Sequence, residues 1–246
     1  MVGSSDAMRR VEREALLAAR GNANVLITGE RGVGKSAVAR FIHERSDRSA
    51  HGFAMIKCEG LPDLLVESEL FGHVRGSFTG AYRDKPGLLE LVPGGTIFLD
   101  EVGALSPTIQ ARLLRFLETG EYRRIGDDRV RIQNTARLDV RFIASTTGNL
   151  PALVAAGLFL DDLYGRLNVT SLSVPPLRER RDDIPSLVDH FSGQVAGFSE
   201  IPKVERDALC RAEWPGNVRE LKSVVLRKLL SAAARNLRQT RGTGKV

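Results

Sequence analysis

The sequence of 246 residues is short of cysteine, has no long apolar run, and carries no carboxylate near its C-terminal end. Cys58 and Cys210 are too few for a disulfide framework and lack the spacing of zinc ligands. No apolar stretch approaches the roughly 20 residues that a membrane span needs. The first residues, MVGSSDAMRRVEREALLAAR, are charged throughout and lack the apolar core of a signal peptide. These absences argue against a secreted or membrane protein, and we expect a cytoplasmic one.

The net charge of +6 comes from the C-terminal end of the chain. No Asp or Glu follows Glu220, so the basic residues beyond it account for the whole excess. A basic tail of this kind either contacts DNA or is a solvated helix end, and the composition alone leaves both open. The residues concerned are Lys222, Arg227, Lys228, Arg235, Arg238, Arg241 and Lys245.

Short apolar segments alternate with helical ones through the first two thirds of the chain. This alternation predicts an α/β fold, with a parallel sheet sandwiched by helices. From about residue 182 the pattern is only helical, so we expect an α/β domain at residues 1–176 and a small helical domain with a basic tail at residues 177–246. The predicted strands cover residues 25–28, 53–57, 96–99, 140–144 and 169–174, and the predicted helices include 6–20, 37–44 and 107–119.

Residues 29–36 read Gly-Glu-Arg-Gly-Val-Gly-Lys-Ser, which fits the P-loop pattern at every fixed position. Glycines let successive backbone N–H groups turn toward phosphate oxygens, and the helix that follows adds the positive end of its dipole. Lys35 would reach the terminal phosphates, and the Ser36 hydroxyl would ligate Mg²⁺. Because a strand is predicted before this segment and a helix after it, we interpret it as a nucleotide site.

A second acidic motif, Thr-Ile-Phe-Leu-Asp-Glu at residues 96–101, ends a predicted buried strand. It would place two carboxylates at the carboxyl edge of the sheet, beside the phosphates. Asp100 would hold Mg²⁺, usually through water, and Glu101 would polarise the attacking water. In isolation, two acids after a strand are more often a helix-capping pair. At this distance behind a P-loop they predict nucleotide hydrolysis.

Several further segments resemble the signatures of one family, the central AAA+ ATPase domain of bacterial sigma-54-dependent transcriptional activators. The resemblance covers about residues 7–225, and its last signature is highly specific. The matching segments are ELFGH at 69–73, GSFTGA at 76–81, GGTIFLDEV at 94–102, PPLRERRDDI at 175–184 and WPGNVREL at 214–221.

The resemblance implies an AAA+ P-loop NTPase whose second domain is a helical lid. It also implies that ATP hydrolysis in a homo-oligomeric ring, commonly a hexamer, remodels the sigma-54 form of RNA polymerase. The segment at 76–81 would be a mobile loop that contacts sigma-54, although Phe78 taken alone could be a core aromatic. The loop residues that match are Gly76, Ser77, Phe78, Thr79, Gly80 and Ala81.

The resemblance adds three residues to the site that the two motifs predict. Arg219 matches a nucleotide-sensing arginine of the lid, Arg166 matches an arginine that reaches the neighbouring subunit's phosphates, and Thr147 occupies the sensor position that is asparagine in the family. Ser36 and Asp100 are the expected Mg²⁺ ligands. The expected ATP-binding residues are Gly29, Glu30, Arg31, Gly32, Val33, Gly34, Lys35, Ser36, Ala37 and Arg219, and the expected catalytic residues are Asp100, Glu101, Thr147 and Arg166.

Three departures from the family pattern bear on catalysis. Lys57 stands where the family has an asparagine, and we expect it to pair with Glu101 and restrain that carboxylate. The alternative is that Lys57 points to solvent or to another acid such as Glu59. Leu160 stands where a second arginine is common. Thr147 can still orient a water, because a hydroxyl both donates and accepts. These differences favour an alternative function, a regulatory AAA+ subunit that binds ATP, hydrolyses it poorly and modulates a partner activator.

Another AAA+ function and the expected absence of further domains complete the predictions. An AAA+ protein of another kind, such as a DNA-replication loader, is disfavoured by GSFTGA. We expect no sensory or helix-turn-helix domain within these residues, so the chain would be a core fragment or a short member that contacts DNA only through its basic tail or a partner.

Overall fold

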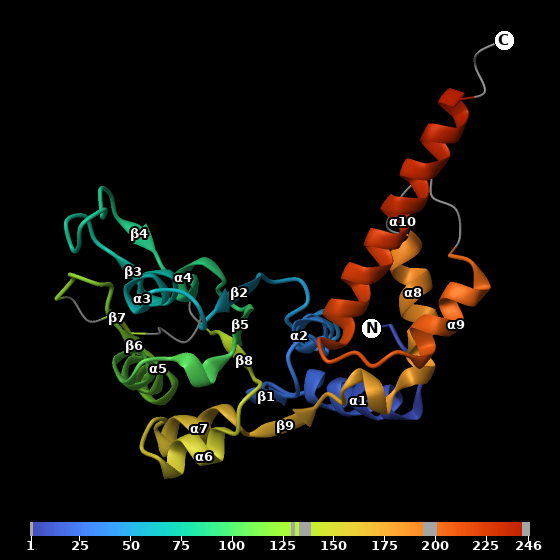
Figure 1. Cartoon of the computed structure of the whole chain (residues 1–246). Helices are drawn as coiled ribbons and strands as arrows, with labels where there is room; N and C mark the ends of the chain where they lie inside the picture. The colour runs from blue at the N-terminus through green and yellow to red at the C-terminus, as the bar shows by residue number, and fades with distance from the viewer. Residues whose placement is uncertain (1, 129–130, 133–138, 194–200, 243–246) are drawn as a thin grey trace. The chain divides into compact units, whose positions relative to one another are not determined.

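A computed structural model describes residues 2–128, 131–132, 139–193 and 201–242 of the chain (Figure 1). For residues 131–132 and 232–242 only the backbone is described. The chain divides into two compact units. The α/β unit consists of residues 13–28 and the described residues from 35 to 173, and the lid unit consists of residues 2–12 and 29–34 together with the described residues from Val174 onward.

The α/β unit is built on a parallel sheet whose described strands follow the order β2-β5-β8-β1-β9. Parallel order brings the carboxyl ends of all these strands to one edge, where ligand sites of open α/β sheets lie. Strand β5, which lies between β2 and β8, is buried along most of its length, as a strand covered on both faces requires. The strands are β1 (Val25–Thr28), β2 (Phe53–Lys57), β5 (Thr96–Asp100), β8 (Arg141–Thr146) and β9 (Thr170–Ser173).

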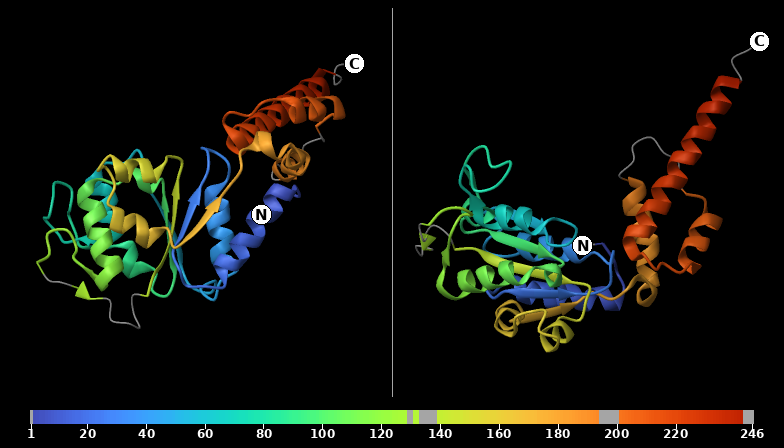
Figure 2. Two further views of the ribbon diagram at one scale, coloured as in Figure 1. Left: turned by 90° about the horizontal axis from the view of Figure 1, so that it is seen from below. Right: turned by 60° about the vertical axis from the view of Figure 1, so that its left-hand side comes forward.

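Helices cover both faces of this sheet. Helix α2 packs on β1, β5 and β8, while α7 packs on β8 and carries α5 and α6 with it. Seen edge-on, the sheet separates α2 from α5, α6 and α7 (Figure 2, left). The helices are α2 (Lys35–Glu44), α3 (Asp63–Phe71), α4 (Leu88–Leu91), α5 (Pro107–Thr119), α6 (Leu150–Ala155) and α7 (Asp161–Leu167), and α1 (Asp6–Ala19) divides between the two units.

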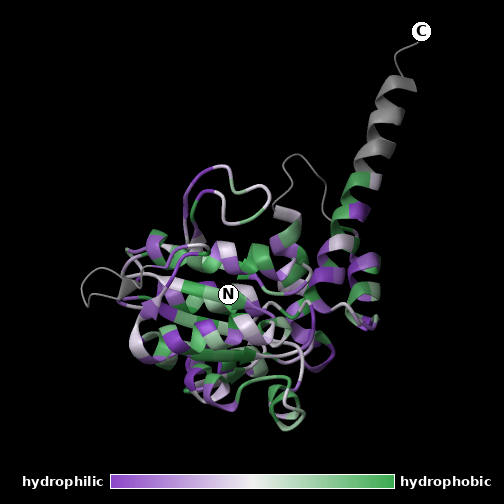
Figure 3. Cartoon of the chain, turned by 90° about the vertical axis from the view of Figure 1, so that its left-hand side faces the viewer, coloured by the Kyte–Doolittle hydropathy of each residue, from purple (hydrophilic) through white to green (hydrophobic). Residues whose placement is uncertain are grey.

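Local sequence explains the bounds of α5. Proline occupies its first turn, where the missing N–H costs no helical hydrogen bond. Gly120 ends the helix with a φ of 71° and donates its N–H to the carbonyl of Phe116. Ile109 and Leu113 are buried on one face of the helix. The apolar strands and helix faces stand out in green in the hydropathy colouring (Figure 3).

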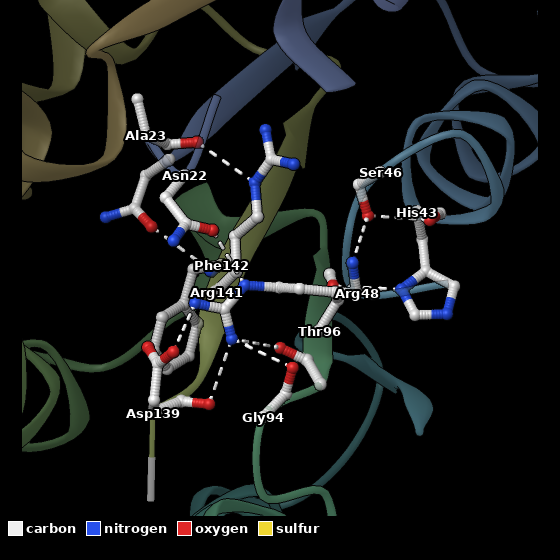
Figure 4. Close-up of polar contacts among 12 residues, drawn as sticks. Asn22, Ala23, His43, Ser46, Arg48, Gly94, Thr96, Asp139, Arg141 and Phe142 are labelled. Carbon is white, nitrogen blue, oxygen red and sulfur yellow. Dashed lines mark hydrogen bonds and ion pairs between the residues drawn. The ribbon is translucent and has the colours of Figure 1, made fainter. Parts of the chain in front are cut away.

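Two buried arginines bind the edge of the sheet at which the strands begin (Figure 4). Arg48 donates to the carbonyl of Gly94 at 2.9 Å and pairs with the Asp139 carboxylate at 2.6 Å. Arg141 donates to the carbonyls of Ala18 and Ala23. Burial, reinforced by the charge of Arg48, lowers the pKa of Arg141. These contacts fasten one edge of the sheet and leave the opposite edge for chemistry.

Two short antiparallel ladders lie outside the main sheet. Strand β3 (Gly72–His73) pairs with β4 (Lys85–Pro86), and β6 (Glu121–Tyr122) pairs with β7 (Arg131–Ile132). The first ladder closes the base of the GSFTGA loop, whose segment 74–84 projects from it. A bridge between His73 and Ile125 links this base to the chain that follows β6.

The lid unit is helical, with α8 (Ile184–Gly193), α9 (Lys203–Arg211) and α10 (Asn217–Gly242) preceded by short 3-10 turns at Leu177–Glu179 and Arg181–Asp183. Its core contains Leu177, Trp214 and Leu221, all buried. Asp183, which is fully buried, accepts hydrogen bonds from the backbone N–H groups of Ser4 and Ser5. The amino-terminal residues are thereby fixed within this unit.

The sequence predicted this architecture, and the five-stranded order within the described residues confirms it. Strands β1 and β2 have the predicted bounds, while α2 begins two residues earlier than predicted, at Lys35. The domain boundary after residue 176 stays a prediction. Within the described part of the chain, no helix is both long enough and apolar enough to cross a membrane. Of the basic tail, the side chains of Arg235, Arg238 and Arg241 and all of Lys245 lie outside the description.

Candidate functional site

Residues 29–34 of the predicted phosphate-binding loop belong to the lid unit, whereas Lys35 and Ser36 belong to the α/β unit. Gly29, Gly32 and Gly34 adopt positive φ values of 147°, 83° and 107°, a region that favours glycine. A side chain at Gly32 would come within 2.3 Å of the Gly216 carbonyl. The glycines that the P-loop pattern requires are therefore used here for left-handed backbone and for close packing on the lid.

Lid side chains hold this loop from outside. Arg178 forms a two-pronged ion pair with the Glu30 carboxylate, at 2.9 and 2.7 Å. Asn217 donates to the same carboxylate and to the carbonyl of Arg31, both at 3.1 Å. The hydrogen bonds from Arg178 and then from Asn217 lower the pKa of Glu30 to about 2. Glu30, predicted as a nucleotide-binding residue, thus keeps its charge and ties the loop to the lid.

In the α/β unit, Lys35 lies at the start of α2 and Glu101 directly after β5. Their side chains form an ion pair at 2.9 Å, with Lys35 only 6% exposed. Thr147, just beyond β8, joins them. Its hydroxyl accepts from the Lys35 ammonium at 2.8 Å and donates to the Glu101 carboxylate, and its backbone N–H donates to that carboxylate at 2.8 Å. Three residues predicted separately from the sequence form one cluster.

Backbone geometry aims Glu101 at this cluster. Its φ of 62° is left-handed, a conformation that costs a non-glycine residue on the order of 1–3 kcal/mol and is concentrated at functional sites. Burial acts to raise the pKa of Glu101, but hydrogen bonds from Thr147 and Lys35 outweigh it and leave the pKa below its usual value. The carboxylate is therefore ionised, as a group that orients or accepts a proton from water must be.

Asp100 sits beside the cluster, at the end of β5. Its carboxylate accepts a hydrogen bond from Ser145 at 2.7 Å, and the Ser145 hydroxyl also accepts from the backbone N–H of Glu101 at 3.2 Å. The sequence reading missed Ser145, which holds both acids in place. Its only signal was its place in β8, next to the acidic strand. Ser36 and Ala37 are exposed in the first turn of α2.

The pairing expected between Lys57 and Glu101 is wrong. Both residues lie in the described part of the chain, where Glu101 bonds to Lys35 and Thr147 instead. Lys57 is exposed, and strand register places it opposite Asp100. The physical reason is the left-handed backbone of Glu101, which turns its side chain out of the direction that β5 would have given it.

The two predicted arginines lie in different units. Arg166, on α7, is 53% exposed and lies 3.6 Å from the Glu118 carboxylate, so among the described residues it does not join the Lys35 cluster. Arg219, in the lid unit, is exposed. Its backbone N–H donates to the carbonyl of Gly32 at 3.2 Å, which places its side chain beside the phosphate loop.

The GSFTGA loop is tightly turned, with Gly76 donating its N–H to the carbonyl of Ala81 at 2.8 Å. Phe78 is half-buried and packs edge-on against the ring of His73, with ring centroids 4.9 Å apart. Thr79 and Gly80 are exposed at the tip. Tyr82, directly after the loop, is 87% exposed. The solvent-facing aromatic of this region is therefore Tyr82 rather than Phe78.

Comparison with known families decides the classification. Residues 1–173 match the family described as the sigma-54 interaction domain. This chain belongs to that family. Residues 178–240 match the AAA+ ATPase lid domain. The resemblance read from the sequence motifs is confirmed.

Individual relatives agree with this classification. The Nif-specific regulatory protein of Azotobacter vinelandii is 42% identical over 234 residues, which are 94% of this chain and 44% of the relative. The anaerobic nitric oxide reductase transcription regulator NorR of Escherichia coli (strain 55989 / EAEC) is 45% identical, covering 96% of this chain and 47% of that protein. NtrX from Brucella abortus, solved in complex with ATP, superposes with a TM-score of 0.82 at 36% identity, covering 94% of this chain and 52% of NtrX. The chain spans about half the length of these relatives.

The residues present fit a magnesium nucleotide. A Cβ added at Gly34 would meet no described atom within 4 Å, so this part of the loop can be closely approached. The exposed hydroxyl of Ser36 and the carboxylate of Asp100 are the hard oxygen donors that Mg²⁺ prefers. Lys35 and the amino end of α2 supply positive potential for phosphate. The P-loop motif therefore supplies groups that can bind phosphate, and Ser36 and Asp100 supply oxygen atoms that can bind Mg²⁺.

Proposed function

We propose that this chain binds ATP with Mg²⁺ and hydrolyses it to remodel the sigma-54 form of RNA polymerase. The observation that carries the proposal is the cluster of Lys35, Glu101 and Thr147. It joins a phosphate-binding cation, an ionised carboxylate and a sensor hydroxyl at the carboxyl edge of the sheet. Membership of the sigma-54 interaction domain family supports the choice of partner. Such a partner places the activity in the bacterial cytoplasm.

In this proposal Lys35 exchanges one anion for another. With no phosphate at hand, its ammonium is neutralised by Glu101; when ATP binds, the terminal phosphates take over that role. Glu101 is then free to orient a water and accept its proton, which is worth on the order of 10²–10⁴ in rate for a well-placed base. Thr147 keeps the carboxylate aimed during the exchange. Mg²⁺, held through Ser36 and Asp100, would neutralise charge on the phosphates.

The GSFTGA loop is the proposed sigma-54 contact. It has no group suited to phosphate chemistry, and its tip is exposed. We expect Thr79→Ala to leave ATPase activity within about twofold, as for a surface substitution, while abolishing capture of sigma-54. Co-sedimentation with sigma-54, in the presence of a transition-state analogue of ATP hydrolysis, measures the capture. Tyr82→Ala is a matched exposed-site variant, and undiminished capture by Thr79→Ala would remove the loop assignment.

Arg166 is proposed to act on a neighbouring subunit of a homo-oligomeric ring, such as a hexamer. Its guanidinium is exposed and, among the described residues, forms a loose ion pair with Glu118 at 3.6 Å, which supports an outward role. ATPase activity per protomer should therefore rise with protein concentration. Mixing wild type with Arg166→Ala should lower activity more than dilution does, and Glu118→Ala serves as the control. Activity independent of concentration in a sedimenting monomer would exclude the ring.

A regulatory subunit that binds ATP but hydrolyses it slowly is the second candidate. Leu160, 38% exposed and uncharged where the family commonly has an arginine, is the observation that favours it. Steady-state ATPase measurements of the purified chain, with and without sigma-54, separate the two. ATP turnover that changes when sigma-54 is added supports the remodeller. Tight ATP binding with negligible turnover supports the regulatory subunit.

A further inference from the structure

The outer surface of the phosphate loop is covered by lid groups that the family motifs leave unexplained. Three successive loop carbonyls each accept a hydrogen bond from the lid. Arg31 receives one from the Asn217 side chain at 3.1 Å, Gly32 from the Arg219 backbone at 3.2 Å, and Val33 from the Arg180 side chain at 2.6 Å. A peptide plane whose carbonyl is held outward has its N–H directed the other way. The lid is thus placed to set the curl of the loop.

Asn217 is the centre of this arrangement. It is fully buried and holds a φ of 53°, unusual for a residue other than glycine. Its side-chain oxygen accepts from the backbone N–H of Leu177 at 2.7 Å, inside the lid. Its side-chain nitrogen donates to Glu30 and to Arg31. One amide therefore serves the lid with its acceptor and the phosphate loop with its donors.

We propose that Asn217 is a positioning residue that pre-forms the phosphate loop and couples it to the lid. The proposal rests on the function proposed above only where it concerns ATP. Since coupling is reciprocal, a lid that orders the loop strengthens phosphate binding, and phosphate binding in turn stabilises the lid. The role differs from the one expected of Arg219, whose exposed side chain would contact the nucleotide itself.

Two substitutions distinguish the role of the Asn217 side-chain oxygen from that of its side-chain nitrogen. Asn217→Asp keeps the acceptor for Leu177 and tolerates positive φ, but it loses both donors and sets a second carboxylate against Glu30. Asn217→Gly keeps the backbone conformation and loses all side-chain contacts. Lys228→Ala is the control, because it removes a lid ion pair with Glu205, at 2.7 Å, that does not touch the loop.

The first measurement uses the chain without nucleotide. Hydrogen exchange of the amides of residues 29–34 should accelerate in both Asn217 variants and stay unchanged in Lys228→Ala. Trp214, the single tryptophan and buried in the lid core, reports lid unfolding by fluorescence. Both Asn217 variants should unfold their lids at a lower denaturant concentration than wild type, Asn217→Gly because it loses the side-chain contacts and Asn217→Asp because it buries a second carboxylate against Glu30. The exchange of the loop amides therefore carries the test. If Asn217 stabilised only the lid, the variants would shift the unfolding transition seen by fluorescence but leave the exchange rates of the loop amides unchanged. That result would overturn the proposal.

The second measurement is equilibrium binding of ATP with Mg²⁺. Losing a hydrogen bond to a charged group should weaken affinity about tenfold in Asn217→Asp, and Lys228→Ala should bind as wild type does. Unaltered affinity in Asn217→Asp, with loop exchange also unaltered, would overturn the inference. If wild type itself fails to bind ATP, the proposed function falls, while the exchange measurement still decides the role of Asn217.

Discussion

Each unit of the molecule holds one acidic residue of the predicted site against a cation, and the two pairs differ in what surrounds them. Lys35 and Glu101 meet at 2.9 Å with exposed fractions of 6% and 20%, whereas Arg178 and Glu30 meet at 2.7 Å with 52% and 42%. Solvent screens the second pair much more than the first. In the proposed mechanism the phosphates of ATP compete with Glu101 for Lys35. No anion competes with Glu30 for Arg178 in that mechanism. One pair is therefore built to be exchanged and the other to persist.

Removing Lys35 tests the exchangeable pair and has the largest expected effect. We expect Lys35→Ala to abolish measurable ATP binding, since losing a buried charge partner costs about 3 kcal/mol or more, over a hundredfold in affinity. Equilibrium binding of a fluorescent ATP analogue measures it. Glu101→Gln is the matched variant from the same pair. It should bind ATP at least as well as wild type, because Lys35 no longer has to leave a carboxylate. Equal binding by Lys35→Ala and wild type would refute the phosphate-loop assignment.

Acid titration tests the persistent pair. The pKa of Glu30 is lowered from 4.5 to about 2, so its contribution to lid stability is complete above about pH 4.5 and is lost as the pH falls toward 2. Trp214 fluorescence in denaturant should show wild type losing stability across this window. Glu30→Gln should lose less across the same window, because it has no proton to take up there. Parallel curves for the two proteins would mean that the ion pair with Arg178 adds nothing in solution. The effect is modest, since the pair is exposed.

Sequence reasoning predicted the sheet and most of the cluster, because both follow from local patterns. Apolar runs such as Val25–Thr28 fix strands, and parallel order brings the residues after them to one edge. The role of Asn217 could not be predicted in this way. WPGNVREL shows where the residue lies in the chain, but the contact with Glu30 joins segments 187 residues apart. Ser145 was missed for a similar reason, since its hydroxyl matters only through the register between β5 and β8.

Local patterns also led to the wrong expectation that Lys57 pairs with Glu101. The prediction with the smallest expected effect tests whether Lys57 restrains that carboxylate. Strand pairing alone placed Lys57 beside the acidic motif, and register does set it opposite Asp100. What the pattern could not show is the left-handed backbone of Glu101, which delivers that carboxylate to Lys35 and Thr147. An exposed lysine with no bond to the carboxylate is not its restraint. We therefore expect Lys57→Asn to change single-turnover hydrolysis by less than about twofold, as for a surface substitution.

Single-turnover hydrolysis by both proteins at saturating ATP measures this change, and Lys57→Met controls for loss of charge without a new amide. A clear rate increase in both variants would show that Lys57 reaches Glu101 once Lys35 has turned to the phosphates. In that case Lys57 would replace Lys35 as the partner of Glu101 after ATP binds. The two ion pairs would then differ in the order of their contacts during the ATPase cycle as well as in their burial. An increase in Lys57→Asn alone would instead assign the gain to the amide. Equal rates in all three leave Lys35 as the cation that holds Glu101, and place any weakness in hydrolysis at Leu160 or Thr147.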